Sequence, residues 1–348
     1  MKAAVLRGAA IAIEELPDPR PAAGQVLLAP LATGICGSDL HAVEGHRTAA
    51  AAGAELPAIV MGHEFCAEVI ALGPDTSSRF VAGARVTAIP FAATDDGPKT
   101  VGLSPEYPGG FATLTVVEES SLIAVPDAVP AAHAALTEPL AVGLHAVNLT
   151  DDGNEAPSIV LGCGPIGLAV ILALRAQGRG PIVAADLSAA RRAAAKGLGA
   201  DVVVDPADAS PYERLEGFGF IEETISPLLG AGAGRAGGVT VFECVGAPGL
   251  IAQVMSGAPR HSRVVVVGVC PGVDQITPLT GITKELSVQF SLAYRPEEFA
   301  VALELIAAHP ELVETLITSR LPLTEVRGAF EELASQTEQI KVLIEPQR

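Results

Sequence analysis

Two short segments of the chain carry side chains that could hold a metal ion. Cys36 lies in the sequence GICGSDLH, and Gly62 is followed directly by His63 and Glu64. A catalytic zinc site takes three protein ligands and keeps one position open, and a thiolate, an imidazole and a carboxylate suit that requirement. Since 27 residues separate Cys36 from His63, the fold must bring them together. Spacing alone leaves this a candidate, because a lone cysteine in a glycine turn is usually structural and Gly-His-Glu is commonly a capped turn.

A second pattern predicts a dinucleotide-binding loop. Residues 162–167 read GCGPIG and fit G-x-G-x-x-G, between a predicted strand at 159–161 and a predicted helix at 166–176. In such a loop Gly162 permits the tight turn, Gly164 lets the backbone approach a pyrophosphate, and Gly167 lets helix and strand pack closely. Pro165 and Ile166 complete the loop, and the helix N-terminus directs a partial positive charge towards the phosphates.

Asp186 lies 19 residues beyond Gly167, at the end of the next predicted strand. A carboxylate at this place in a Rossmann unit holds the ribose hydroxyls of the adenosine and favours NAD. The alternative interpretation is an ordinary strand-to-helix turn with Asp186 as the helix cap.

The elements that must position these residues divide into two kinds. Before residue 147, short strands at 25–29, 65–72 and 84–90 alternate with turns, which indicates an irregular β-rich domain. From Ser158 onward strands and helices alternate, which predicts βαβ units and a parallel, doubly wound sheet. Helices at 296–308 and 323–334 and a strand at 340–344 follow. We expect an α/β protein with a catalytic domain at 1–147 and 286–348 and a Rossmann domain at 148–285, the latter with a further helix around 221–228.

Composition excludes several classes of partner. The formal net charge is −18, and an acidic surface repels nucleic acid and anionic lipid. Five scattered cysteines argue against a disulfide framework. Arg7 interrupts the first apolar run before a signal peptide can develop, and the apolar run at 159–174 is too short to span a bilayer. We expect a cytoplasmic protein.

The chain as a whole resembles the zinc-containing medium-chain dehydrogenases/reductases, in their polyol and secondary-alcohol dehydrogenase branch. The resemblance covers nearly the whole chain, and its motifs occur in the family's order and near its spacing. The matching segments are Gly34–Asp39 with His41, Gly62–Glu64, Gly109–Ala112, Glu138–His145, the glycine loop, Phe242–Gly246 and Lys284–Leu286.

The resemblance implies roles for particular residues. Cys36 and His63 match the family's zinc ligands, and its third ligand matches either Glu64 or Glu138. The sequence does not decide between these two carboxylates, which could exchange during turnover. Glu138 is equally interpretable as an anion at a helix N-terminus, before a proline. Asp39 matches a carboxylate that orients the zinc histidine.

One stretch departs from the family's pattern. Many members bind a second, structural zinc through four cysteines, but residues 85–110 contain none. We therefore expect one catalytic zinc per chain and no structural zinc, with a β-rich domain of the GroES-like type.

The implied activity is reversible hydride transfer between a secondary alcohol or polyol and NAD, giving a ketone or aldehyde. Zinc would polarise the alcohol oxygen as a Lewis acid. Ser38 would take the proton, and His41 would carry it onward towards solvent.

A homodimer or homotetramer is expected. One alternative is a zinc-free enone or quinone reductase of the same superfamily, against which the Cys36 and His63 ligands count. The other is a non-catalytic cofactor-binding protein.

Overall fold

The computed structural model describes residues 1–92, 94, 97–150, 156–220, 238–335 and 338–348. The chain forms two compact units. Unit 1 comprises Met1–Glu138 and Phe299–Arg348, and unit 2 comprises Pro139–Glu298. The helix predicted at 221–228 lies outside the described residues. No helix in the described part of the chain is long and apolar enough to cross a membrane.

Unit 1 is built mainly from short antiparallel strands. Its largest sheet has the order β10-β6-β5-β3-β18-β17, with β9 paired to β3, and smaller sheets have the orders β2-β1-β4 and β7-β8. Its strands are β1 (Lys2–Arg7), β2 (Ala10–Glu15), β3 (Gln25–Gly34), β4 (Ile59–Val60), β5 (Glu64–Leu72), β6 (Arg85–Ala88), β7 (Phe91–Ala92), β8 (Lys99–Thr100), β9 (Thr115–Glu118), β10 (Leu122–Ala124), β17 (Ile317–Pro322) and β18 (Lys341–Glu345). This is the β-rich, GroES-like part that the sequence predicts.

Helices in unit 1 are few, and the longest was not predicted. They are α1 (Gly37–Ala51), α2 (Ala131–Ala134), most of α8 (Pro296–Ala308), α9 (Pro310–Glu314) and α10 (Val326–Leu333), with 3₁₀ turns at Glu119–Ser121 and Leu323–Glu325. The helix α1 buries only Asp39 and His46. Sequence periodicity missed it because it has no apolar stripe and its alanines are compatible with many conformations.

Unit 2 is a doubly wound Rossmann sheet. Its six parallel strands have the order β13-β12-β11-β14-β15-β16. Successive strands are added first on one side of β11 and then on the other, so the order of strands switches beside β11. They are β11 (Ser158–Leu161), β12 (Ile182–Ala185), β13 (Val202–Val204), β14 (Thr240–Glu243), β15 (Arg263–Val266) and β16 (Ser287–Phe290). The buried core is rich in valine, as expected for a sheet covered on both faces.

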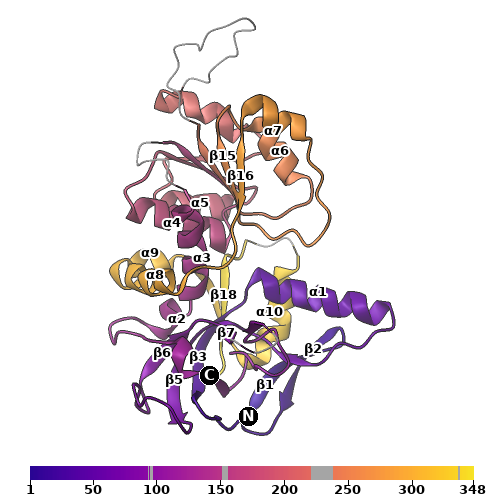
Figure 1. Cartoon of the computed structure of the whole chain (residues 1–348), viewed down its shortest axis with the longest axis vertical. Helices are drawn as coiled ribbons and strands as arrows, with labels where there is room; N and C mark the ends of the chain where they lie inside the picture. Colours follow the sequence, from indigo (N-terminus) through magenta and orange to yellow (C-terminus); the bar gives the residue numbers. More distant parts are fainter. Residues whose placement is uncertain (93, 95–96, 151–155, 221–237, 336–337) are drawn as a thin grey trace, which may run out of the picture. The chain divides into compact units, whose positions relative to one another are not determined.

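The helices α4 (Pro165–Ala176) and α5 (Ala189–Gly197) lie on one side of this sheet, and α6 (Leu250–Gly257) and α7 (Pro278–Lys284) lie on the other (Figure 1). A 3₁₀ segment covers Pro211–Phe218. Two helices start next to the unit boundaries, α3 (Thr137–Asn148) and α8 (Pro296–Ala308). The α/β fold class predicted from the sequence is confirmed.

The two compact units divide the chain at other positions than the predicted domain boundaries. A methyl group added at Gly143 of α3 would lie 2.6 Å from the Ala169 Cβ of α4, so α3 packs closely within unit 2. The strand β16 completes the Rossmann sheet, which extends unit 2 past residue 286. The assignment of folding domains to 1–147 with 286–348, and to 148–285, stays a prediction.

Candidate functional site

Strand pairing in unit 1 brings the predicted metal donors together. The end of β3 pairs with the start of β5, with Gly34 opposite Glu64. Cys36 follows two residues after Gly34, and His63 immediately precedes Glu64. One donor atom of each of Cys36, His63 and Glu64 lies within 4.8 Å of the others. Sulfur, nitrogen and oxygen donors at this separation fit zinc, which binds all three ligand types.

The start of α1 fixes the orientation of these donors. Cys36 is the N-cap of α1, and its backbone N–H donates to Asp39 Oδ2 at 2.9 Å. The other Asp39 oxygen lies 3.5 Å from His63 Nδ1, an electrostatic contact longer than a hydrogen bond. Ser38 Oγ lies 3.3 Å from His63 Nε2. Asp39 thus contacts both predicted ligands, as expected of a carboxylate that orients the histidine.

His63 is buried with acidic neighbours. Burial would lower the pKa of its imidazole, but the Asp39 carboxylate and the Cys36 thiol outweigh burial and hold that pKa well above its usual value. The Asp39 carboxylate and the Cys36 thiol therefore stabilise a positive charge at His63.

A lysine that sequence analysis missed lies directly against the donor group. Lys341 is the first residue of β18, and its Nζ contacts Glu64 Oε2 at 2.6 Å and Oε1 at 2.9 Å. The same Nζ donates to the Ile35 carbonyl at 3.0 Å. Both side chains of the ion pair are almost completely buried, with 2% and 1% exposed. Burial would lower the Lys341 pKa, yet the charges of Glu64, Cys36 and Glu138 raise it above its ordinary value.

Gly34 makes room for this ion pair. A Cβ at position 34 would lie 2.1 Å from Glu64 Oε2 and 3.3 Å from Lys341 Cδ. Any larger residue there would push the carboxylate aside. Two signals in the sequence pointed to this ion pair. They were Gly34 at the end of a buried strand and Lys341 at the start of an apolar strand.

The remaining predicted residues of unit 1 lie at the edge of the donor group. Glu138 is 8% exposed in the first turn of α3 and is not one of the three grouped donors. Its charge is nevertheless close enough to stabilise the Lys341 ammonium. His41 is exposed on α1, one helical turn after Ser38. Residues three apart on a helix are surface neighbours, so Ser38 and His41 lie on the same side of α1.

The glycine loop of unit 2 has the backbone that a pyrophosphate site requires. Gly162 has a φ of +86°, which disfavours other residues. A Cβ at Gly167 would lie 1.8 Å from the Gly162 carbonyl oxygen. Gly164 caps α4 and has open space where its Cβ would be. This open cradle at a helix N-terminus fits a dinucleotide phosphate.

Asp186 follows β12 and contacts the glycine loop. Its Oδ2 accepts a hydrogen bond from the Cys163 backbone N–H at 2.7 Å, and its Oδ1 accepts one from the Ser188 N–H at 2.8 Å. The N-cap of α5 is Ser188, so the cap role considered for Asp186 belongs to another residue. Arg192 forms an ion pair with Asp205 at 2.8 Å, so its guanidinium is bound to the Asp205 carboxylate.

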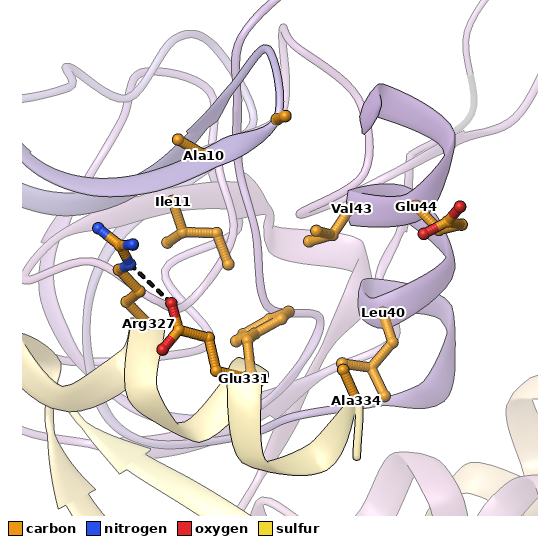
Figure 2. A pocket seen from close by; sticks show the side chains of 10 residues that line it. Ala10, Ile11, Leu40, Val43, Glu44, Arg327, Glu331 and Ala334 are labelled. Carbon is orange, nitrogen blue, oxygen red and sulfur yellow. Dashed lines mark hydrogen bonds and ion pairs between the residues drawn. The ribbon is translucent and has the colours of Figure 1, made fainter. Parts of the chain in front are cut away.

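A separate hollow of about 220 Å³ lies on unit 1, between β2, α1 and α10 (Figure 2). Leu40 and Val43 extend into it from α1, and the Arg327–Glu331 ion pair borders it. Its ten lining residues include none of the predicted metal donors.

Two family matches cover most of this architecture. Residues 22–127 match the alcohol dehydrogenase GroES-like domain, and residues 165–308 match the zinc-binding dehydrogenases. The chain is 30% identical to (R,R)-butanediol dehydrogenase from Bacillus subtilis, across 97% of this chain and 96% of the relative. The chain belongs to the zinc-type alcohol dehydrogenase family. This confirms the medium-chain dehydrogenase/reductase membership expected from the motifs, and the protein is an oxidoreductase.

Other relatives of this dehydrogenase support the same assignment. Sorbitol dehydrogenase from Halalkalibacterium halodurans is 30% identical, over 96% of this chain and 95% of that one. The crystal structure of 2R,3R-butanediol dehydrogenase from Bacillus subtilis matches with a TM-score of 0.82, covering 99% of each chain at 30% identity. The dehydrogenase therefore shares both fold and sequence with enzymes that act on small alcohols and polyols.

Proposed function

We propose that this dehydrogenase transfers a hydride between a secondary alcohol or polyol and NAD, using one zinc ion held by unit 1. The observation that carries the proposal is the Cys36, His63 and Glu64 donor set within 4.8 Å. The relatives named butanediol and sorbitol dehydrogenase support the substrate class. When bound, zinc supplies Lewis-acid polarisation of an alcohol oxygen, and NAD supplies the hydride acceptor.

The chain's own residues supply position and a route for the proton. The contact between Ser38 Oγ and His63 Nε2 keeps the serine hydroxyl beside the donor group. Ser38 takes the alcohol proton and passes it to the exposed His41 imidazole, which releases it to solvent. Asp39 holds His63 in orientation while the proton leaves.

For the cofactor we propose NAD rather than NADP. The Asp186 carboxylate at the glycine loop can accept hydrogen bonds from ribose hydroxyls but repels a 2′-phosphate. Arg192 is bound to Asp205 and to the backbone carbonyls of Asp186 and Leu187, so it is held away from that role. The Gly162–Gly167 loop, including Pro165 and Ile166, would hold the pyrophosphate.

The experiment that tests this function is a panel of alcohols screened by NADH absorbance. We expect turnover of vicinal diols or polyols with NAD, and loss of that turnover in Cys36→Ser. Turnover of enones or quinones with retention of activity in Cys36→Ser would support the zinc-free reductase instead. Cofactor binding without turnover of any alcohol or carbonyl compound would support a non-catalytic protein.

We further propose that the chain forms a homo-oligomer through the β16 edge of the Rossmann sheet. Val288, Phe290 and Leu292 are 37%, 70% and 88% exposed at this edge, and Leu279 and Ile282 of α7 are exposed too. An apolar edge strand is self-complementary, because two copies can pair antiparallel about a two-fold axis. Phe290→Lys should shift the mass in solution to that of a monomer, whereas Val81→Lys in unit 1 should not.

A cytoplasmic location stays a prediction.

A further inference from the structure

The three carbonyl groups directly before His63 are all hydrogen-bonded to one short, later segment of unit 1. Residues 109–111 donate their backbone N–H groups to residues 60–62, which lead into the His63 position. The bonds run from Gly109 to Val60, from Phe111 to Met61 and from Gly110 to Gly62, with lengths of 2.8, 3.0 and 2.7 Å. The backbone before this predicted metal ligand is therefore held at three consecutive residues.

Another part of the same loop lies directly against Gly62. A Cβ built on Gly102 would be 2.7 Å from the Gly62 carbonyl oxygen and 2.9 Å from the Gly62 nitrogen. Both separations are far below van der Waals contact, so a side chain fits at position 102 only if Gly62 moves. Gly102 is fixed in turn, because its N–H donates to the Tyr107 carbonyl at 2.8 Å. Residues 102–111, here called the 102–111 loop, thus enclose the peptide that precedes His63.

The side chain of His63, by contrast, has only long contacts to hold it. Its Nδ1 lies 3.5 Å from Asp39 Oδ1 and has no hydrogen bond within the described part of the chain. Its Nε2 lies 3.3 Å from Ser38 Oγ, which is long for a hydrogen bond. A metal ligand must be held within about 0.5 Å of its productive position. The backbone of His63 must therefore contribute much of that precision.

We propose that the 102–111 loop is a positioning element for the metal centre, in which Gly102 and the three N–H donors fix the backbone of His63 and thereby its imidazole. The inference rests on the proposed zinc site but not on the identity of the substrate. It differs from an orienting side chain such as Asp39, because the loop acts on the histidine only through the main chain.

Thr33 of β3 supports the proposal independently. Its hydroxyl donates to the Gly110 carbonyl at 2.9 Å, and its Cγ2 would lie 2.8 Å from a Cβ at Gly62. The strand β3 leads to Cys36, two residues after its end. The same loop is therefore joined to the backbones that carry two of the predicted metal donors.

The test measures zinc affinity by competition with a chromophoric chelator at fixed pH. Gly102→Ala places a Cβ against Gly62 and should weaken zinc binding about 10–100-fold, the usual effect of losing a contact that orients a metal ligand. Gly97→Ala is the matched control. Gly97 has a φ of +102° and Gly102 one of +81°, so alanine is strained at both, but a Cβ at Gly97 meets open space. Gly97→Ala should lower Tm and leave zinc affinity unchanged.

Thr33→Val tests the same loop without a steric clash, which keeps the proposal testable if Gly102→Ala does not fold. It removes the hydrogen bond to Gly110 and keeps a side chain of similar shape. Zinc binding should weaken about tenfold, the lower end of the same range. Thr87→Val is its control, since that equally buried hydroxyl donates to the Phe65 carbonyl at 2.9 Å and not to the loop. It should leave zinc affinity unchanged.

The rise in Tm caused by zinc gives a second readout that needs no substrate. A ligand that binds only the folded protein stabilises it according to its affinity, so this rise should shrink in Gly102→Ala and in Thr33→Val. Each control should keep the full rise even where its metal-free Tm is lower. The comparison thereby separates loss of positioning from loss of stability.

Wild-type zinc affinity in folded Gly102→Ala, or in Thr33→Val, would overturn the proposal. An equal loss in Gly97→Ala would overturn it too, because backbone strain without contact to Gly62 would then suffice. These outcomes are separate from failure of the proposed function. A wild type that binds zinc but turns over no alcohol would refute the reaction, and the affinity comparison would still decide the role of the loop. A wild type that binds no zinc would refute both.

Discussion

The Asp186 carboxylate accepts a hydrogen bond from the backbone N–H of Cys163 at 2.7 Å, which ties the end of β12 to the glycine loop after β11. The proposed ribose-binding group and the proposed phosphate-binding loop are therefore adjacent before any cofactor binds. Such preorganisation lowers the cost of ordering the site when the dinucleotide arrives.

This placement predicts that NAD is preferred over NADP by at least tenfold in kcat/KM, about 1.4 kcal/mol. A 2′-phosphate carries about −1.5 to −2 charges and would face the Asp186 carboxylate. Asp186→Ala should erode the preference mainly by weakening NAD. Steady-state kinetics with both cofactors measures this, and equal or better use of NADP by the wild type would show that Arg191 or Arg192 accepts the phosphate.

Two glycines of the loop should respond differently to the same substitution. Gly167→Ala places a Cβ 1.8 Å from a backbone oxygen, so it should lower Tm and abolish NAD binding. Gly164→Ala meets open space, so it should leave Tm unchanged and raise the NAD Kd about tenfold by obstructing the phosphate. Gly45→Ala on α1, also in open space, is the control for both. Undiminished NAD affinity in Gly164→Ala would show that the phosphate does not approach this backbone.

The proton route predicts a graded response at α1. Ser38→Ala should lower kcat by about 10²–10⁴-fold, the usual contribution of a positioned acid–base group. Ser38→Thr keeps the hydroxyl and should retain most activity, and His41→Gln should cost less than Ser38→Ala because water can partly replace an exposed terminal group. Zinc content must stay unchanged in each variant, since Ser38 contacts His63. Wild-type turnover in Ser38→Ala would rule the route out.

Burial predicts which cysteines resist alkylation. Burial raises the pKa of the Cys66 thiol to about 12, and burial together with the Asp186 charge raises that of Cys163 to about 12. A raised thiol pKa means that at pH 8 the reactive thiolate is only about one part in 10⁴. Peptide mapping after iodoacetamide should find Cys270 modified first, and Cys36 modified only in metal-free protein. Modification of Cys66 as fast as Cys270 would contradict this.

The sequence predicted the elements whose signals are local. The alternation of apolar runs with helical segments identified the Rossmann sheet, and the helix predicted at 296–308 coincides with α8 (Pro296–Ala308). Glycine spacing located the dinucleotide loop because each glycine answers a nearby steric demand, as the contact between positions 162 and 167 shows. Local patterns of this kind can be read without knowledge of the tertiary fold.

Long-range relationships could not be predicted in this way. Lys341 and Glu64 are separated by 277 residues, and no periodicity links a lysine at the start of β18 to a carboxylate at the start of β5. The choice between Glu64 and Glu138 was equally open, because strand pairing rather than residue type groups Glu64 with Cys36 and His63. The helix α1 was missed because it lacks an apolar stripe, although the contact between the Cys36 N–H and Asp39 that caps its start is local.

The central claim is one zinc ion per chain, held by Cys36 and His63. The most direct measurement is the metal content of purified wild type and Cys36→Ser by inductively coupled plasma mass spectrometry, alongside NADH formation from the alcohol panel. We expect one zinc per chain in the wild type, and loss of both zinc and activity in Cys36→Ser. Two zinc ions per chain, or an active wild type without zinc, would contradict the account.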